Sequence, residues 1–168
     1  KYLAGHNDVL EGVVVTNSLE LYEKLFYNLN TTGAVLSPFD SYQLIRGLKT
    51  LSLRMERSTA NAQEIVAFLE QSPAVKEVLY TGRGGMISFK VADEKRIPHI
   101  LNTLKVFSFA ESLGGVESLI TYPTTQTHAD IPAEVRHSYG LTDDLLRLSI
   151  GIEDARDLIE DLRQALEG

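Results

Sequence analysis

Arg147 is the residue that most clearly suggests chemistry, because it lies in a run that otherwise has the composition of a buried strand. In LLRLSIGI, residues 145–152, strand alternation places Arg147 and Ser149 on the face opposite the aliphatic side chains. A guanidinium is rarely buried without an anionic partner, and this run contains no carboxylate. The residues leave two readings open. One is a site for an anionic ligand, and the other is a buried ion pair with Glu111, Glu117 or Asp130.

The turn ESLGGVES, residues 111–118, is a second candidate. Gly114 and Gly115 permit a positive φ or a close backbone approach, and Ser112 supplies a hydroxyl just before them. Taken alone, such a motif is more often a structural turn than a site. Together with Arg147, it predicts a small anionic ligand held by a two-pronged guanidinium and a hydroxyl.

The remaining composition excludes several kinds of function. The four histidines lack metal-ligand spacing. The chain has no cysteine, which rules out disulfides and thiol nucleophiles and fits a reducing cytoplasm. A net charge of −7 without a basic stripe argues against a nucleic-acid binder. No apolar run approaches the roughly 20 residues that span a bilayer. The 168 residues suit one domain, or a domain plus part of another.

Helices and strands must position these candidate residues. The pattern of expected elements changes near residue 72, where long helices give way to short strands. The first part, 1–72, reads as the tail of a larger α/β domain with a linking helix. Its expected elements are a strand over 9–17, a helix over 18–30, a loop over 31–40 and a long helical region from 41 to about 71, kinked at Gly47.

The second part, 73–168, reads as a compact α+β domain with mostly antiparallel strands. The expected strands are 75–80 and 84–91 as a hairpin, 106–110 and 116–123 around the ESLGG turn, and the strand that carries Arg147. The expected helices are 93–104 capped by Asp93, a short helix from Pro132, and a closing helix over 153–168.

Seven collinear motifs resemble the Cys/Met-metabolism enzymes that depend on pyridoxal phosphate (PLP), the family of cystathionine γ-synthase, cystathionine lyases and O-acylhomoserine sulfhydrylase. The motifs run in order through the whole chain. They are KYLAGHNDVLEG, TTGAVLSPFDSY, LIRGLKTLSLRMERSTANAQ, GGMISF, FAESLGGVESLITYP, THADIP and LLRLSIGIEDARDLIEDL. The resemblance implies an α/β fold of the aspartate-aminotransferase-like PLP-dependent transferase class. Residues 1–72 would then end the large PLP-binding domain, and residues 73–168 would form the small C-terminal domain.

The resemblance also implies roles for individual residues. Lys1 matches the lysine that binds PLP covalently, and Arg147 matches the arginine that binds the substrate α-carboxylate. Ser112 and Thr127 match positions that line the carboxylate pocket. By this resemblance, the anionic partner of Arg147 would be the carboxylate of an amino-acid substrate.

Two further positions concern the far end of the substrate and the subunit arrangement. Glu111 matches a position near the distal end of the substrate, where an acidic side chain suits a cationic group. Asn30 matches a loop position that approaches the active site of the neighbouring subunit.

The activity implied by the resemblance is γ-replacement on O-acylhomoserine, giving cystathionine with cysteine or homocysteine with sulfide. A cystathionine β- or γ-lyase is the alternative within enzymes, and a non-catalytic homologue or binding module is the alternative of another class. The implied partners are amino-acid substrates, an N-terminal segment expected before Lys1 and identical subunits in a cytoplasmic homotetramer. The short turn at 81–83 resembles the short-loop synthase and sulfhydrylase branch.

Overall fold

The computed structural model describes all 168 residues and is built around one five-stranded sheet. The strands are β1 (Val75–Tyr80), β2 (Met86–Val91), β3 (Ser108–Phe109), β4 (Leu119–Thr121) and β5 (Leu145–Ser149). Their order across the sheet is β1-β2-β5-β4-β3. All neighbouring pairs are antiparallel except β3 and β4. The expected mostly antiparallel sheet is confirmed.

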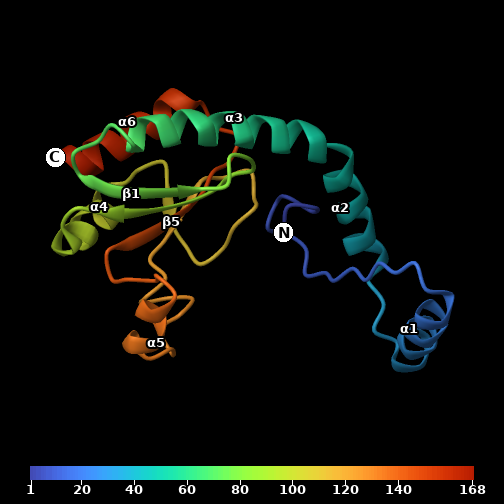
Figure 1. Ribbon diagram of the computed structural model, residues 1–168. Coiled ribbons are helices and arrows are strands. Elements are labelled where there is room, and N and C mark those ends of the chain that lie inside the picture. Colours follow the sequence, from blue (N-terminus) through green and yellow to red (C-terminus); the bar gives the residue numbers. More distant parts are fainter.

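Six α-helices surround or extend from this sheet. They are α1 (Leu19–Thr32), α2 (Pro38–Lys49), α3 (Leu51–Leu69), α4 (Ile97–Thr103), α5 (Ala133–Ser138) and α6 (Ala155–Glu167), with a short 3₁₀ turn, η1 (Glu94–Arg96), before α4. Helices α3 and α6 lie together on one face of the sheet (Figure 1). The segment that begins at Lys1 lies beyond the sheet, near the junction of α2 and α3 (Figure 1).

The core forms where the helix-covered face of the sheet meets α3, α4 and α6. On β5 and just after it, Leu146, Leu148 and Ile150 are fully buried, so the alternation expected around Arg147 is confirmed. One buried cluster joins these side chains to Ile65 of α3 and Leu162 of α6. Burial of this apolar surface is the main stabilising contribution to the fold.

Two carboxylates fasten the surrounding elements to this core. Asp161 of α6 is 5% exposed and accepts hydrogen bonds from three successive backbone amides after α4, at residues 105–107. Asp144 lies just before β5 and accepts from Lys76 of β1. Burial alone would raise the pKa of Asp144, but hydrogen bonds from Thr142 and Lys76 outweigh it and hold that pKa below its ordinary value.

The strand expected over 9–17 is wrong. Residues 8–17 have no helical or strand structure in the chain, and Leu10 and Val15 are 95% and 87% exposed. A β-branched run forms a strand only where a neighbouring strand accepts its backbone hydrogen bonds. None of the five strands of the sheet pairs with this segment.

The long helical region contains a break, which lies at Thr50 rather than at Gly47. Helix α2 ends at Lys49 and α3 begins at Leu51, with Thr50 between them in a non-helical conformation. The expected loop over 31–40 is also shorter, because Ser37 caps α2 through Asp40 N–H and Pro38 occupies its first turn.

Strands β3 and β4 do not form a pair across a tight turn. They pair in parallel, so the ESLGG segment must cross over between them, since parallel strands cannot be joined by a two-residue hairpin. The hairpin between β1 and β2 is confirmed. Gly82 and Gly84 in its turn both have a positive φ, a conformation that other residues rarely adopt.

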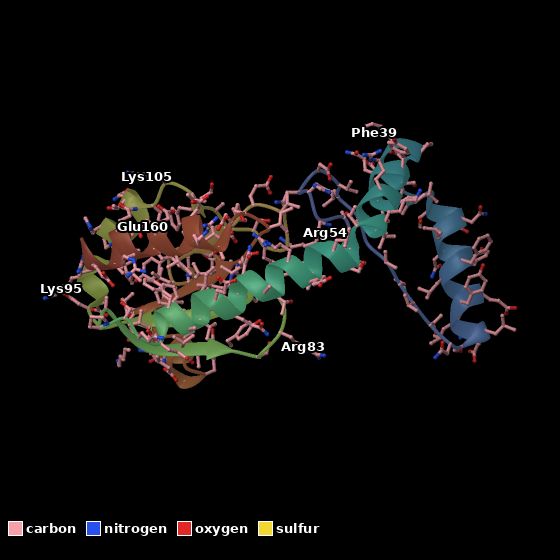
Figure 2. All side chains as sticks on the ribbon, turned by 90° about the horizontal axis from the view of Figure 1, so that it is seen from above. Phe39, Arg54, Arg83, Lys95, Lys105 and Glu160 are labelled. Atoms are coloured by element: carbon pink, nitrogen blue, oxygen red, sulfur yellow. The ribbon has the colours of Figure 1, made fainter.

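Helix α1 forms as expected but lies apart from the sheet (Figures 1 and 2). Ser18 caps it and Gly33 ends it in the left-handed region. None of its residues is buried, although it carries several large apolar side chains. The exposed ones are Leu19, Leu21, Tyr22, Leu25, Phe26, Tyr27 and Leu29.

The division of the chain at residue 72 stays a prediction. None of the helices combines the length and the hydropathy that a bilayer-spanning segment requires.

Candidate active site

Arg147 lies in the middle of β5, on the face that points away from the core. Its cross-strand neighbours are Ser88 on β2 and Thr121 on β4, so a row of polar side chains crosses the sheet at this level. The Arg147 Nη2 donates to Thr121 Oγ1 at 3.1 Å and to the backbone oxygen of Ser112 at 3.3 Å. Strand β5 therefore supplies the guanidinium, and the hydrogen bonds with Thr121 and Ser112 hold only its Nη2 atom.

The rest of the guanidinium has no anionic partner. Its Nε is buried and makes no hydrogen bond, and no carboxylate lies within salt-bridge distance of it. Burial lowers the pKa of Arg147, and the charge of Glu111 partly opposes this effect from a longer distance. The alternative of a buried ion pair with Glu111, Glu117 or Asp130 is wrong. An unsatisfied buried donor of this kind is costly unless a ligand accepts from it.

Lys1 and Ser112 line one shared pocket of about 280 Å³, together with residues of the 4–11 segment. The Ser112 hydroxyl reaches Asn7 Oδ1 at 3.5 Å, while its carbonyl accepts from Arg147. Ser112 thus links the amine-bearing segment to the arginine. The structure connects the three predicted site residues through Ser112, which shares a pocket with Lys1 and a hydrogen bond with Arg147.

Gly114 explains how the two segments come so close. It has a φ of +77°, and a Cβ added to it would lie 3.3 Å from Lys1 Cβ and 3.1 Å from Tyr2 N. Its N–H donates to the buried Ser149 Oγ at 2.8 Å. A larger residue at this position would push the Lys1 segment away from the sheet.

Thr127 and Glu111 lie on loops around this centre. The Thr127 hydroxyl is 2.7 Å from His128 Nδ1 and has no hydrogen bond with Arg147. Glu111 is exposed and acts on Arg147 only through its charge. Their roles toward a substrate stay predictions.

Asn30 is not brought to the site. It lies in the exposed last turn of α1, so the expectation of a loop position is wrong. Helix α1 is separate from β5 in both views (Figures 1 and 2). The predicted approach of Asn30 to a neighbouring subunit remains a prediction.

Sequence reasoning missed three residues that shape the site, namely Asn7, Thr121 and Ser149 in its contact with Gly114. Thr121 lies opposite Arg147 in the register of β4 against β5, and no pattern within either strand supplies that register. Asn7 also carried no signal. Its positive φ of 55° depends on how the segment after Lys1 folds back.

The arrangement suits chemistry on an amino acid. A two-pronged guanidinium binds a carboxylate, and a primary amine nearby can form a Schiff base or move a proton. These groups lie on a sheet and on a segment packed against it.

Solved structures of the same shape belong to enzymes with this chemistry. A cystathionine γ-lyase (CalE6) from Micromonospora echinospora has a TM-score of 0.96 and 37% identity, covering 100% of this chain and 48% of its own. A cystathionine γ-synthase from Xanthomonas oryzae pv. oryzae in complex with cystathionine has a TM-score of 0.92 and 41% identity, covering 99% and 48%. The fold is that of the α/β PLP-dependent transferases, which confirms the predicted fold class.

Sequence relatives identify the family. The cystathionine γ-synthase/O-acetylhomoserine (thiol)-lyase of Bacillus subtilis is 57% identical over 99% of this chain and 44% of its own length. A cystathionine γ-lyase of the same species is 51% identical, covering 99% and 48%. A cystathionine β-lyase of Lactococcus lactis subsp. cremoris is 48% identical, covering 99% and 48%. The chain spans about half the length of these relatives.

The model of the family described as "Cys/Met metabolism PLP-dependent enzyme" matches residues 1–167. The chain belongs to this family. The predicted cofactor, pyridoxal phosphate, is confirmed at the level of the family. The residues present fit it, because the amine of Lys1 lines a pocket with Ser112, and Ser112 accepts from Arg147, whose Nε has no hydrogen-bond partner.

Proposed function

We propose that the full-length protein catalyses γ-replacement on an O-acylhomoserine, forming cystathionine with cysteine or homocysteine with sulfide. The observation that carries this proposal is Arg147, a half-buried guanidinium whose Nε is buried and unsatisfied and which has no carboxylate partner. A substrate carboxylate would satisfy it. A non-catalytic binding module would have no use for the lysine that lies on the same side of the sheet.

Each residue has a defined task in this proposal. Arg147 binds the α-carboxylate and so fixes the orientation of the Cα–H bond. The Lys1 amine holds the cofactor and then takes the proton from Cα. When bound, PLP accepts the electron pair left at Cα. Ser112 and Thr127 line the carboxylate pocket.

The later steps move one more proton and exchange the group at Cγ. Removal of a Cβ proton allows the Cγ–O bond to break, so that the acyloxy group leaves as a carboxylate. The thiol, as its thiolate, then forms the Cγ–S bond, the protons taken from Cα and Cβ return to those carbons, and the thiol proton is released with the carboxylate. Lys1 is the base within this chain for these transfers, because its side chain lines the same pocket as Ser112 and a primary amine can move a proton.

Glu111 supports cysteine as the acceptor. Its charge acts on Arg147, so it lies within electrostatic range of the proposed site, and its family position is near the distal end of the substrate. The Glu111 carboxylate would attract a cationic group in the part of the substrate that lies away from its α-carboxylate. The amino group of cysteine, or of the distal half of cystathionine, is such a group.

The alternative is a cystathionine β- or γ-lyase. The alignments with the lyases extend over 183 residues, whereas the alignment with the B. subtilis γ-synthase covers the same share of this chain in 166. The lyases thus carry extra residues that this chain lacks. This difference favours the synthase branch, in agreement with the short turn between β1 and β2.

A product assay on the full-length protein tests the reaction type. Three mixtures are offered: O-acetylhomoserine with cysteine, O-acetylhomoserine with sulfide, and cystathionine alone. We expect cystathionine and homocysteine from the first two and slow turnover of the third. Efficient release of homocysteine and pyruvate from cystathionine, without any use of acylhomoserine, would identify a β-lyase. Release of cysteine would identify a γ-lyase.

The apolar side chains of α1 support further contacts in the full-length protein. Val14 and Val15, with Tyr22, Phe26 and Leu29, line an open groove of about 620 Å³. A preceding segment of the same protein or an identical subunit would cover such a surface. The homotetramer, the placement of the activity in methionine biosynthesis and the cytoplasmic location remain predictions. Native mass measurement and cell fractionation test the first and the last.

A further inference from the structure

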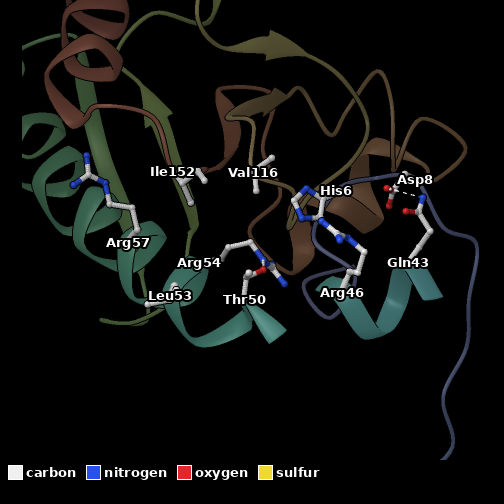
Figure 3. Close-up of a pocket in the computed structure, with 10 residues that line it drawn as sticks. All are labelled: His6, Asp8, Gln43, Arg46, Thr50, Leu53, Arg54, Arg57, Val116 and Ile152. Carbon is white, nitrogen blue, oxygen red and sulfur yellow. Dashed lines mark hydrogen bonds between the residues drawn. The ribbon is translucent and has the colours of Figure 1, made fainter. Parts of the chain in front are cut away.

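We propose that Arg54 is a positioning residue for Lys1, because its guanidinium fixes the backbone that immediately follows the lysine. The hydrogen bonds of Arg54 with this segment are present in the structure whatever the function of the protein. Their consequence for the cofactor rests on the function proposed above. Arg54 lies in the first turn of α3, and its side chain turns back toward Thr50 (Figure 3).

Arg54 directs most of its donors to backbone oxygens rather than to a carboxylate. Its Nη1 donates to the Tyr2 carbonyl at 2.8 Å, and its Nη2 donates to the Leu3 carbonyl at 3.3 Å. Nη2 also donates to the Gly47 carbonyl at 2.8 Å, and Nε donates to Thr50 Oγ1 at 3.1 Å. The side chain is only 7% exposed and takes part in no ion pair.

The break between α2 and α3 makes this position possible for a cation. Gly47 lies in the last turn of α2, where unsatisfied carbonyls carry a partial negative charge. Burial lowers the pKa of Arg54, and the helix end compensates part of that cost. The break at Thr50 thus creates a site in which a guanidinium bridges a helix terminus and the Lys1 segment.

The Tyr2 and Leu3 carbonyls depend on Arg54. No backbone N–H donates to either of them, so loss of the guanidinium would leave both without a partner in the chain. The backbone hydrogen bond that closes this turn runs from Gly5 N to the Lys1 carbonyl, at 2.8 Å. Arg54 therefore holds the middle of a turn whose first residue is Lys1.

Two glycines show how closely the parts fit. Gly5 has a φ of +80°, and a Cβ on it would collide with the Arg54 guanidinium. A Cβ on Gly47 would collide with the Ala4 carbonyl. A side chain at Gly47 would therefore displace the backbone of the Lys1 segment, and a side chain at Gly5 would displace the Arg54 guanidinium from its acceptors or the segment itself. An amine placed by such a rigid turn holds its orientation better than one on a loose loop.

The test uses the full-length protein with Arg54→Met, which approximates the length of the side chain but removes all of its donors. Arg57→Met is the matched control. Arg57 lies on the same helix and lines the same pocket, but it is exposed and its one hydrogen bond reaches the Glu153 carbonyl. Both variants remove one positive charge from this surface.

Two readouts follow the turn and the lysine separately. Hydrogen exchange of the Gly5 amide reports the turn without any cofactor. Borohydride reduction followed by peptide mapping reports the fraction of Lys1 that carries pyridoxyl label. We expect Arg54→Met to speed Gly5 exchange by about tenfold, as for loss of one ordinary hydrogen bond, and to lower the label on Lys1. Exchange within α6 should not change, and Arg57→Met should match the parent in both readouts.

Gly5→Ala perturbs the same contact from the other side and covers the case in which Arg54→Met does not fold. Its control is Gly33→Ala, since Gly33 also has a positive φ but has open space around it. We expect Gly5→Ala to reproduce the loss of label at Lys1, whereas Gly33→Ala should retain it. Agreement of the two perturbations would assign the effect to the contact rather than to backbone strain.

Two results would overturn the proposal. One is unchanged Gly5 exchange in a folded Arg54→Met variant. The other is Gly5→Ala with the same label at Lys1 as Gly33→Ala. If the parent protein itself takes no label at Lys1, the proposed function fails instead, and the exchange measurement still decides whether Arg54 fixes the turn.

Discussion

Replacing Arg147 with lysine tests the role of this residue, since Arg147→Lys keeps the charge but loses the planar fork. The guanidinium uses only Nη2 for its hydrogen bonds with Ser112 and Thr121, while Nε is unsatisfied. A lysine amine can still donate to the sheet, but it cannot also present a second parallel donor to a carboxylate. The variant should therefore fold and bind the cofactor but bind the substrate more weakly.

The size of the effect follows from the second hydrogen bond to the carboxylate, which a lysine cannot make. One charge-assisted hydrogen bond contributes about 1.5–3 kcal/mol, which corresponds to a roughly 10- to 150-fold weaker affinity for the amino acid. Within the chain, Arg147 makes two hydrogen bonds, at 3.1 and 3.3 Å. Because a lysine amine can still donate to one of these acceptors, the variant should lose about one such bond, and its free energy of unfolding should fall by about 1.5–3 kcal/mol at most.

The assay is a titration of the cofactor-loaded full-length protein with substrate, followed by absorbance, together with a thermal unfolding curve. Arg136→Lys is the matched control. Arg136 is also a buried arginine, at 9% exposed, but it already pairs with Asp143 at 3.1 Å. We expect the control to leave substrate affinity unchanged.

Unchanged substrate affinity in Arg147→Lys would refute the reasoning, because it would show that the second donor of the guanidinium does not bind the substrate carboxylate. A variant that unfolds while Arg136→Lys remains stable would show that Arg147 holds the sheet together. In that case its position in β5 is structural.

Three further changes test other parts of the account. Glu111→Ala should reduce turnover with cysteine but not with sulfide, which has no amino group to attract; equal losses with both donors would remove the charge argument. Asp161→Ala leaves three backbone amides without an acceptor and should lower the free energy of unfolding by about 3 kcal/mol, measured in urea. Because the pKa of Asp144 is lowered in the folded protein, its contribution to stability is present above its unfolded pKa of about 3.9. The stability difference between the parent and Asp144→Asn should therefore shrink as the pH falls from 7 through the lowered pKa, and a difference that does not change with pH would contradict this.

Local patterns predicted the part of the fold that its own core stabilises. The alternation around Arg147, the hairpin between β1 and β2 and the closing helix appear as expected. The helix expected over 93–104 is shorter, because Asp93 caps the 3₁₀ turn η1 and α4 begins only at Ile97. The confirmed features depend on residues close in sequence and on one apolar face. The failed strand over 9–17 depends instead on a neighbouring strand, which no periodicity within the run can supply.

The site was predictable only in part for the same reason. A lone arginine in an apolar strand indicated a ligand, and the glycines of the ESLGG segment indicated a close approach. The partners of Arg147 come from the register of β4 against β5 and from a crossover loop. The contacts of Arg54 with the Lys1 segment join residues about 50 positions apart in sequence, which spacing along a helix does not reveal.

Peptide mapping after borohydride reduction tests the central claim most directly. The full-length protein is loaded with pyridoxal phosphate, reduced and digested, and the labelled peptide is identified by mass spectrometry. The account predicts that the pyridoxyl group lies on Lys1, in the peptide that contains KYLAGHNDV. Label on another lysine, such as Lys49, would contradict it, as would a protein that takes no label.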